Sequence, residues 1–101
     1  MPRYQIKISP EALSDIQEAT DWYNEQLNGL GARFQKQTVK QINKLASSAG
    51  LYHIRYNDVR CMVVRKFPFL IHFTLNSEQN IVTVYAVFHT SRNPQIWYKR
   101  K

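Results

Sequence analysis

The stretch Val82-Thr83-Val84-Tyr85-Ala86-Val87-Phe88-His89-Thr90-Ser91-Arg92-Asn93-Pro94 closes the β-rich half of this 101-residue chain. Its apolar, β-branched first part predicts the last strand of a sheet, over residues 81–89. Pro94 cannot donate a hydrogen bond to a neighbouring strand, so pairing ends before it. A His, two hydroxyl residues and an Arg lie where this strand reaches the surface. Because a sheet fixes the direction of such residues, they are candidates for binding or chemistry.

Working back from this strand, three further extended segments are predicted. Residues 67–75 alternate in an apolar pattern and are joined to the last strand by a polar loop at 76–80. Residues 59–65 form another strand, and residues 53–56 form a short extended piece before it. Short polar connections between strands are typical of antiparallel neighbours.

The N-terminal half predicts one strand and two helices. Tyr4, Ile6 and Ile8 alternate with polar residues, which indicates a half-buried strand. Ser9-Pro10-Glu11 then follows the pattern of a helix start, and the helix ends at Asn28-Gly29 after about five turns. A second helix is expected over residues 30–47. The first helix is acidic and the second basic, so the two should fold back as an antiparallel hairpin with opposite charge along their flanks.

The resulting order β-α-α-β-β-β predicts an α+β fold, an antiparallel sheet with an antiparallel helical hairpin packed on one face. A chain of this length forms a single domain, residues 1–101. Its end, residues 95–101 (QIWYKRK), is an aromatic-basic tail that is either frayed or docked on the sheet.

Charge is distributed unevenly along the chain. The formal net charge is +7, of which residues 51–101 carry +6 and residues 1–50 only +1. Such a field attracts nucleic acid, an acidic protein segment or an anionic membrane, although a basic protein can also simply be soluble. The single Cys61 excludes an internal disulfide, and no signal peptide or apolar stretch of about 20 residues is present. We therefore expect a cytoplasmic protein that does not enter a membrane.

Several kinds of reactive site lack their sequence pattern. The histidines and Cys61 are scattered singly, so no metal site is expected, and three glycines form no phosphate-binding loop. No cofactor is implied. The acidic residues cluster on one helix, which does not suit a glycosidase-like pair. A nucleophile scheme with Ser91 and His89 lacks an orienting acid, since only Asp58 and Glu78 lie in the β half.

A basic, aromatic and histidine set remains in the β half. Its members are Arg55, Arg60, Arg65, Lys66, His72, Tyr85, His89, Arg92, Trp97 and Tyr98. If residues 67, 69, 71, 73, 82, 84, 86 and 88 face the helices, then His72, Tyr85 and His89 share the opposite face. A His near neutral pKa can move the 2′-hydroxyl proton of RNA, and Arg92 could stabilise the phosphorane charge. The alternative is structural: a hydrogen-bonded surface His89, a packed Tyr85, and Trp97 and Tyr98 covering the sheet.

Four motifs in the chain resemble the RelE/ParE superfamily of type II toxin–antitoxin toxins, in particular its ParE-like plasmid-stabilisation branch. They are S-P-E-A-L-S-D-I (9–16), W-Y-N-E-Q (22–26), R-K-F-P-F-L-I-H-F (65–73) and V-Y-A-V-F-H-T-S-R-N-P (84–94). The resemblance implies the α+β toxin fold and a cognate acidic antitoxin, bound in a toxin–antitoxin hetero-oligomer. The antitoxin would lie in an apolar groove and neutralise the basic face.

The resemblance also implies growth arrest, by one of two routes. ParE-like members poison DNA gyrase, whereas RelE-like members cleave mRNA on the ribosome with Lys and Arg residues and a late Tyr. Arg65 and Arg92 match basic positions of the family, and Trp97 or Tyr98 lies near the late Tyr. Cys61 and Val63 stand where RelE-like enzymes carry lysines, and Leu70 replaces an arginine. The gyrase route is therefore preferred, and RelE-type catalysis is the alternative.

The candidate residues follow from both lines of argument. For metal-independent endoribonuclease chemistry the candidates are His89, Arg92 and Arg65. For binding of the target or of nucleic acid the candidates are Arg60, Lys66, His72, Tyr85, Trp97 and Tyr98. A third possibility, from a different class, is a non-catalytic module that binds nucleic acid or protein through the same basic face.

Overall fold

The computed structural model describes residues 3–100, and its elements follow the predicted order with one strand and one helix more. Lys101, the last residue of the predicted tail, lies outside the described residues. The elements are β1 (Gln5–Ile8), α1 (Pro10–Gln26), α2 (Leu30–Ser48), a 3-10 turn η1 (Ala49–Leu51), β2 (Ile54–Tyr56), β3 (Val59–Val63), β4 (Phe69–Asn76), β5 (Ile81–His89) and α3 (Gln95–Arg100). No helix in residues 3–100 is both long and apolar enough to cross a membrane.

The helical hairpin forms as its sequence predicts. The Ser9 hydroxyl accepts the Ala12 N–H at 3.1 Å and caps α1, with Pro10 in the first turn. Gly29, in the left-handed region at φ 90°, links α1 to α2. At Gly31 the helices approach so closely that a Cβ would lie 2.1 Å from the Thr20 carbonyl oxygen. Only glycine fits at that point of the hairpin.

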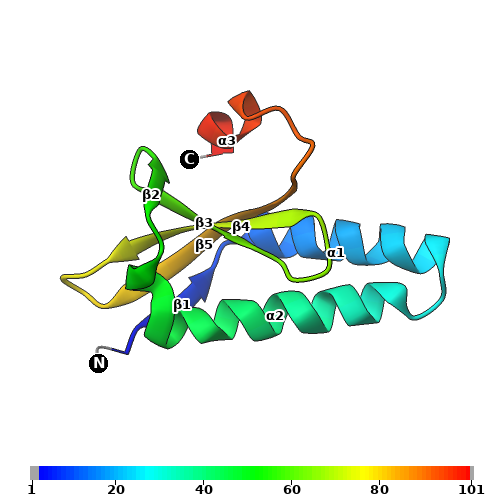
Figure 1. Cartoon of the computed structure of the whole chain (residues 1–101), viewed down its shortest axis with the longest axis horizontal. Coiled ribbons are helices and arrows are strands. Elements are labelled where there is room, and N and C mark those ends of the chain that lie inside the picture. The colour runs from blue at the N-terminus through cyan, green and yellow to red at the C-terminus, as the bar shows by residue number, and fades with distance from the viewer. Residues whose placement is uncertain (1–2, 101) are drawn as a thin grey trace.

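The sheet has five strands in the order β1-β5-β4-β3-β2, and the predicted α+β class is confirmed (Figure 1). Four strands, β2 to β5, are antiparallel neighbours joined by short turns. The first strand differs from the prediction, because β1 pairs parallel with β5. No hairpin turn connects β1 to β5, so turn geometry does not determine the direction of β1.

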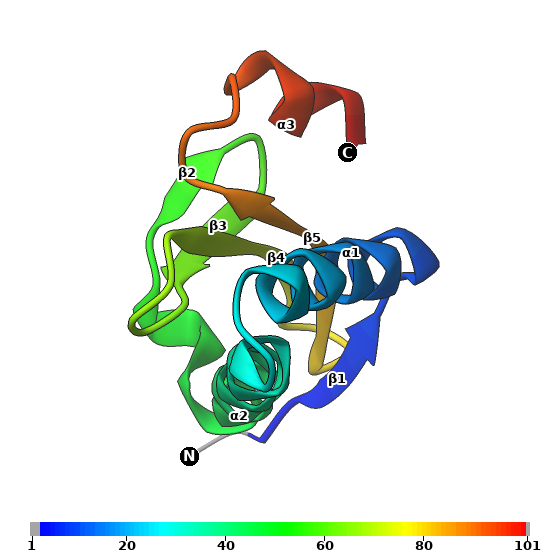
Figure 2. The same cartoon turned by 90° about the vertical axis from the view of Figure 1, so that its right-hand side faces the viewer.

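One face of the sheet packs against α1 and α2, and this side holds the main core (Figure 2). Four aromatic rings meet near the end of the hairpin: Tyr23, Phe34, Phe67 and Phe69 lie with centroids 5.0 to 6.1 Å apart. Such edge and tilted ring pairs contribute beyond the burial of their surface. They fix the turn between β3 and β4, which carries Arg65 and Lys66, against the helices.

A β-bulge in β5 changes which residues face the helices. His72 pairs with Ala86 and Phe73 with Val84, so Tyr85 is an extra residue without an opposite partner. Beyond Tyr85, each residue of β5 therefore faces the opposite side of the sheet from the one that strict alternation predicts. Ala86 and Phe88 therefore lie on the face away from the helices, contrary to the prediction.

The bulge also moves His89, which pairs with Phe69 and lies on the helix side of the sheet. The predicted shared face of His72, Tyr85 and His89 is thus wrong for His89. His72 lies on the face away from the helices, as predicted. Tyr85 does so too, in a hollow with Thr74 and Thr83.

The C-terminal segment docks as a helix on that outer face, opposite the hairpin (Figures 1 and 2). Trp97 is buried there against Leu70, Ala86 and Phe88. Of the two states expected for the tail, the docked one is present. Within residues 3–100 no acidic side chain of α1 comes within 4.0 Å of a basic side chain of α2. The opposite charges of the two helices thus form no ion pair between them in the described residues, and Asp15 instead pairs with Arg100 of α3 at 2.9 Å.

Candidate functional site

His72 lies at the centre of the outer sheet face, beneath α3, and is fully buried. Its Nδ1 is 2.9 Å from the Tyr56 hydroxyl and 3.5 Å from Cys61 Sγ. The rings of Trp97 and Phe88 lie 4.8 and 5.2 Å from the His72 ring. β2, β3, β4, β5 and α3 thus each contribute a side chain to one enclosed aromatic cluster, which we call the His72 cluster.

Burial determines the protonation of the His72 cluster. Desolvation, with the nearby charges of Arg55 and Arg100, lowers the pKa of His72 to about 4. Burial raises the pKa of the Tyr56 hydroxyl to about 12 and that of the Cys61 thiol to about 11. At neutral pH Tyr56 and His72 are therefore both uncharged, and one hydrogen bond joins the Tyr56 hydroxyl to Nδ1. Within residues 3–100 the Nε2 atom of His72 has no hydrogen-bond partner.

Three arginines surround the cluster, and each guanidinium lies over an aromatic ring. Arg55 lies 5.3 Å from the Trp97 ring centroid, while Arg92 and Arg100 lie 5.5 and 4.9 Å from that of Phe88. Cation–π contacts of this kind are worth about 0.5–2 kcal/mol each. The basic residues of this face therefore help to hold α3 over the sheet. With α3 docked, His72 cannot reach the proton of a substrate.

The polar residues at and after the end of β5 lie on both faces of the sheet. The His89 ring lies 5.2 Å from Phe69 on the helix side, and its Nδ1 accepts the Ser91 N–H at 3.0 Å and the Ser91 hydroxyl at 2.7 Å. Arg92 lies over Phe88 on the other side. Arg65 is exposed just beyond β3. The three residues considered for catalysis are thus not joined by contacts into one site.

The remaining predicted binding residues fall into two groups. His72 is enclosed beneath α3, and Trp97 of α3 is buried. Tyr98 of the same helix is exposed, with its ring 5.1 Å from that of Tyr56. Arg60 donates a hydrogen bond to the Tyr52 carbonyl oxygen, and Lys66 is exposed in the left-handed region at φ 73°. Within residues 3–100 no three His, Cys, Asp or Glu side chains are arranged to hold a metal ion.

The positions compared with RelE-type catalytic residues differ in their surroundings. Leu70 is buried against Trp97, and Cys61 is half-buried beside His72. Val63 is exposed at the end of β3. None of the three side chains can carry a positive charge at neutral pH, so none could neutralise phosphate.

A residue that sequence reasoning missed is Gln41 of α2. Its side-chain amide bonds to the backbone of Val63 in β3 and of Arg65 just beyond β3, and the side chain is buried. Its position was a usable signal, because Gln41 has the helical spacing of the apolar stripe formed by Phe34, Ile42 and Leu45 and so falls on the buried face of α2. A buried polar side chain in such a stripe requires hydrogen-bond partners.

Comparison with known proteins gave one family and several related structures. The model of the family described as ParE toxin of the type II toxin–antitoxin system parDE matches residues 6–94. No curated protein sequence matches the chain.

Among solved structures, one from the chromosomal ParDE toxin–antitoxin system of P. aeruginosa superposes with a TM-score of 0.78 at 16% identity, covering 90% of this chain and 100% of that one. A mutant of the E. coli toxin RelE in the free state gives 0.70 at 16% identity, covering 97% and 93%. The RelBE2 toxin–antitoxin complex of Mycobacterium tuberculosis gives 0.64 at 13% identity, covering 86% and 98%. At these identities the structures establish a shared fold.

Proposed function

Because this chain belongs to the ParE toxin family of type II toxin–antitoxin systems, within the RelE/ParE superfamily, we propose that it arrests growth by inhibiting DNA gyrase. The observation that carries the proposal is the family match over residues 6–94. Its partner is an antitoxin, and we propose that this antitoxin is acidic, since the toxin carries a net charge of +7.

The side chains at the positions where RelE-like enzymes carry basic catalytic residues support the gyrase route over RNA cleavage. Cys61, Val63 and Leu70 supply no cation for a scissile phosphate. The histidine of the outer face, His72, is buried and neutral, with a pKa of about 4. An acid–base group has to reach the proton that it moves, and α3 stands in the way. A toxin that acts by binding a protein target needs no such group.

One feature favours the alternative, RelE-like cleavage of mRNA on the ribosome. Tyr98 is exposed on the outer face, and Arg55 lies over the neighbouring Trp97 ring. Basic residues and a late tyrosine are the residue types that the RelE resemblance implies for catalysis. The experiment below therefore separates the two routes, and also separates both from a non-catalytic binding module.

The test is controlled induction in cells that lack the antitoxin. Gyrase inhibition predicts growth arrest with a DNA-damage response and filamentation, which antitoxin co-expression relieves. The strength of growth arrest is compared between the variants Arg65→Ala and Arg92→Ala, both at exposed side chains, and the matched control Lys7→Ala. Translation arrest with mRNA cuts at codon positions would replace the proposal by the nuclease route. Normal growth at full expression would remove the toxin assignment for this chain.

A further inference from the structure

The loop that joins α1 to α2 carries the only asparagine–glycine pair of the sequence, Asn28-Gly29. The pair lies at the end of the helical hairpin, in a segment that we call the hairpin tip, residues 27–31 (Figure 1). Both residues are exposed. Asparagine is among the thermolabile side chains of proteins. The nitrogen that attacks its amide is the backbone nitrogen of the next residue, so the identity of that residue matters.

Neither of the two reacting groups is held by a hydrogen bond. In the part of the chain that the structure describes, the Asn28 side-chain amide and the Gly29 N–H have no partner. The turn is closed instead by the Leu30 N–H, which donates to the Leu27 carbonyl oxygen at 2.9 Å. Gly29 lies at φ 90° and has no Cβ, so no side chain shields its nitrogen and its backbone changes conformation at little cost. The Gly29 nitrogen is therefore free to approach Asn28.

The other asparagines of the chain lack one of these conditions. Each is followed by a residue with a side chain, which crowds the backbone nitrogen: Asn24, Asn43, Asn57, Asn76, Asn80 and Asn93. Pro94, after Asn93, has no N–H at all. Asn76 is exposed at the end of β4, and its side-chain oxygen accepts the Gln79 N–H at 3.1 Å. Asn76 is therefore a suitable internal comparison for Asn28.

We propose that Asn28 is a site of spontaneous deamidation, by attack of the Gly29 backbone nitrogen on the Asn28 side-chain amide. The nitrogen bonds to Cγ, and its proton leaves with the amide nitrogen as ammonia, which closes a five-membered succinimide. One water molecule then opens this ring at either of its two carbonyl carbons. The net change converts one amide and one water into one carboxylate and one ammonium ion, and nothing is oxidised or reduced.

Opening of the ring at the bond between Cγ and the Gly29 nitrogen gives an aspartate with an ordinary backbone. This product adds a negative charge immediately before Gly29, the N-cap of α2. The first turn of α2 holds no acidic residue, and negative charge near the start of a helix is favourable. The aspartate product therefore leaves the hairpin at least as stable as the unmodified chain.

Opening at the other carbonyl gives an isoaspartate, whose main chain runs through the side-chain CH2 and is one carbon longer. The hairpin tip is held at fixed points on both sides of this addition. The Leu30 N–H bonds to Leu27, and the Gly31 N–H donates to Asn24 Oδ1 at 2.8 Å. Gly31 also lies so close to the Thr20 carbonyl oxygen that no Cβ fits between them. The longer chain strains these contacts, so the isoaspartate product loosens the hairpin tip.

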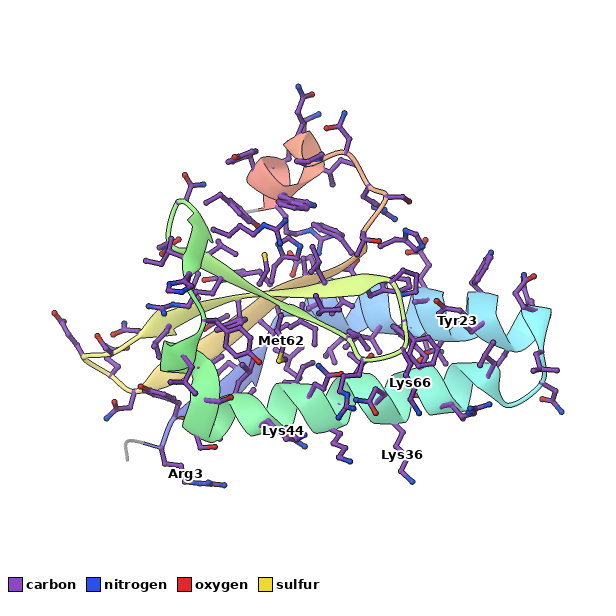
Figure 3. All side chains as sticks on the ribbon, in the orientation of Figure 1. Arg3, Tyr23, Lys36, Lys44, Met62 and Lys66 are labelled. Carbon is purple, nitrogen blue, oxygen red and sulfur yellow. The ribbon has the colours of Figure 1, made fainter. Side chains whose placement is uncertain are left out.

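A looser tip affects the turn between β3 and β4. Tyr23 and Phe34 lie next to the tip on α1 and α2, with ring centroids 5.3 Å apart. Both contact Phe67, with centroids at 5.2 Å. Figure 3 shows Tyr23 beside the turn that carries Lys66, the neighbour of Phe67 in the chain. Deamidation at the tip therefore loosens the support of Lys66 and of Arg65 before it.

The test follows the purified chain during incubation at pH 7 and at pH 8.5. Tryptic peptides are analysed by mass spectrometry, with electron-transfer fragmentation to distinguish aspartate from isoaspartate. Each deamidation adds about one dalton. Asn28 should deamidate at least tenfold faster than Asn76. The rate at Asn28 should be at least fivefold higher at pH 8.5 than at pH 7, because the attacking nitrogen has to lose its proton.

Two matched variants test the assignment to Asn28. Asn28→Gln keeps an exposed amide but requires a six-membered ring, which forms more slowly, so the mass gain at this position should slow at least tenfold. Asn76→Gln makes the same change at the comparison site and should leave the rate at Asn28 unchanged. Equal rates at Asn28 and Asn76 would overturn the proposal, and so would an unchanged rate of mass gain at position 28 in Asn28→Gln.

A third variant, Asn28→Asp, separates the effect of charge from that of the longer backbone. The isoaspartate fraction of the aged chain is purified by ion exchange and compared with Asn28→Asp, which has the same charge. Amide hydrogen exchange over residues 29–34 and 65–69 should be at least fivefold faster in the isoaspartate fraction. Equal exchange in the two proteins would overturn the effect on the hairpin tip. These measurements use purified protein, so their outcome is independent of growth arrest and of the function proposed above.

Discussion

The Asp15 carboxylate of α1 accepts two hydrogen bonds from the Arg100 guanidinium of α3, at 2.9 and 3.2 Å, although the residues are 85 positions apart. The same carboxylate accepts the Val87 N–H of β5 at 3.0 Å. Beyond Val84, β5 has no pairing with β1. Asp15 thus bonds to a backbone N–H at the open edge of β5, as Gln41 does at the end of β3. It also links the last helix, α3, to the first, α1.

Removing the Asp15 carboxylate should therefore cost more than removing a surface charge. Asp15→Ala leaves the Val87 N–H and Arg100 without this partner, and we expect a loss of about 2–3 kcal/mol in the free energy of unfolding. Asp15→Asn keeps an acceptor for Val87 and should lose about half as much. Urea denaturation measures both, with the exposed Glu18→Ala as control. A loss at Asp15→Ala no larger than at Glu18→Ala would show that the ion pair contributes nothing.

The docking of α3 depends on Trp97, of which 8% is exposed. Trp97→Ala removes its packing against Leu70 and Phe88, and we expect a loss of about 3 kcal/mol with faster amide exchange over residues 95–100. Trp22 provides a matched control, since 56% of this residue is exposed and Trp22→Ala should cost below about 1 kcal/mol. Unchanged exchange over residues 95–100 in Trp97→Ala would contradict this role.

Burial of His72 predicts a specific pH dependence of stability. Its folded-state pKa of about 4 lies below the ordinary 6.5, so the unfolded chain takes up the proton first as the pH falls. The contribution of neutral His72 is complete above pH 6.5 and is lost towards pH 4, by about 3 kcal/mol. His72→Gln should flatten the stability profile between pH 7 and pH 4.5, whereas the exposed His53→Gln should not. Parallel profiles for the wild type and His72→Gln would refute the assignment.

Close packing of the hairpin can be tested at Gly31, with Gly50 of η1 as the control. Gly31→Ala places a methyl group against the Thr20 backbone, and we expect a loss of about 2–3 kcal/mol or more. Gly50→Ala meets no atom closer than 3.5 Å and should be close to neutral. Thermal unfolding of the two variants measures the difference. A Gly31→Ala protein as stable as Gly50→Ala would mean that the helices can separate at no cost.

The α+β order, the capped first helix and the helical hairpin could be predicted because each depends on local sequence. Ser9 and Pro10 are neighbours of the helix that they start, and the 76–80 loop joins the strands that it pairs. The direction of β1 could not be predicted, since its partner β5 lies over 70 residues away. Periodicity indicates that a strand is half-buried but does not name its neighbour.

The candidate site was less predictable, because a bulge at a single residue changes which face of the sheet the following residues occupy. Tyr85 forms a bulge without a Gly or Pro signal, and the alternation that placed His89 beside His72 ends there. The burial of His72 arises from α3, whose six residues could equally have been frayed. Gln41 was missed because its partners, Val63 and Arg65, are more than 20 residues away.

The proposed inhibition of DNA gyrase is measured most directly in a supercoiling assay with the purified enzyme, relaxed plasmid and increasing amounts of this chain. Under this proposal, supercoiling falls as the chain is added and is restored by the cognate antitoxin. Supercoiling that is unchanged at a molar excess of a folded chain that still arrests growth would contradict it.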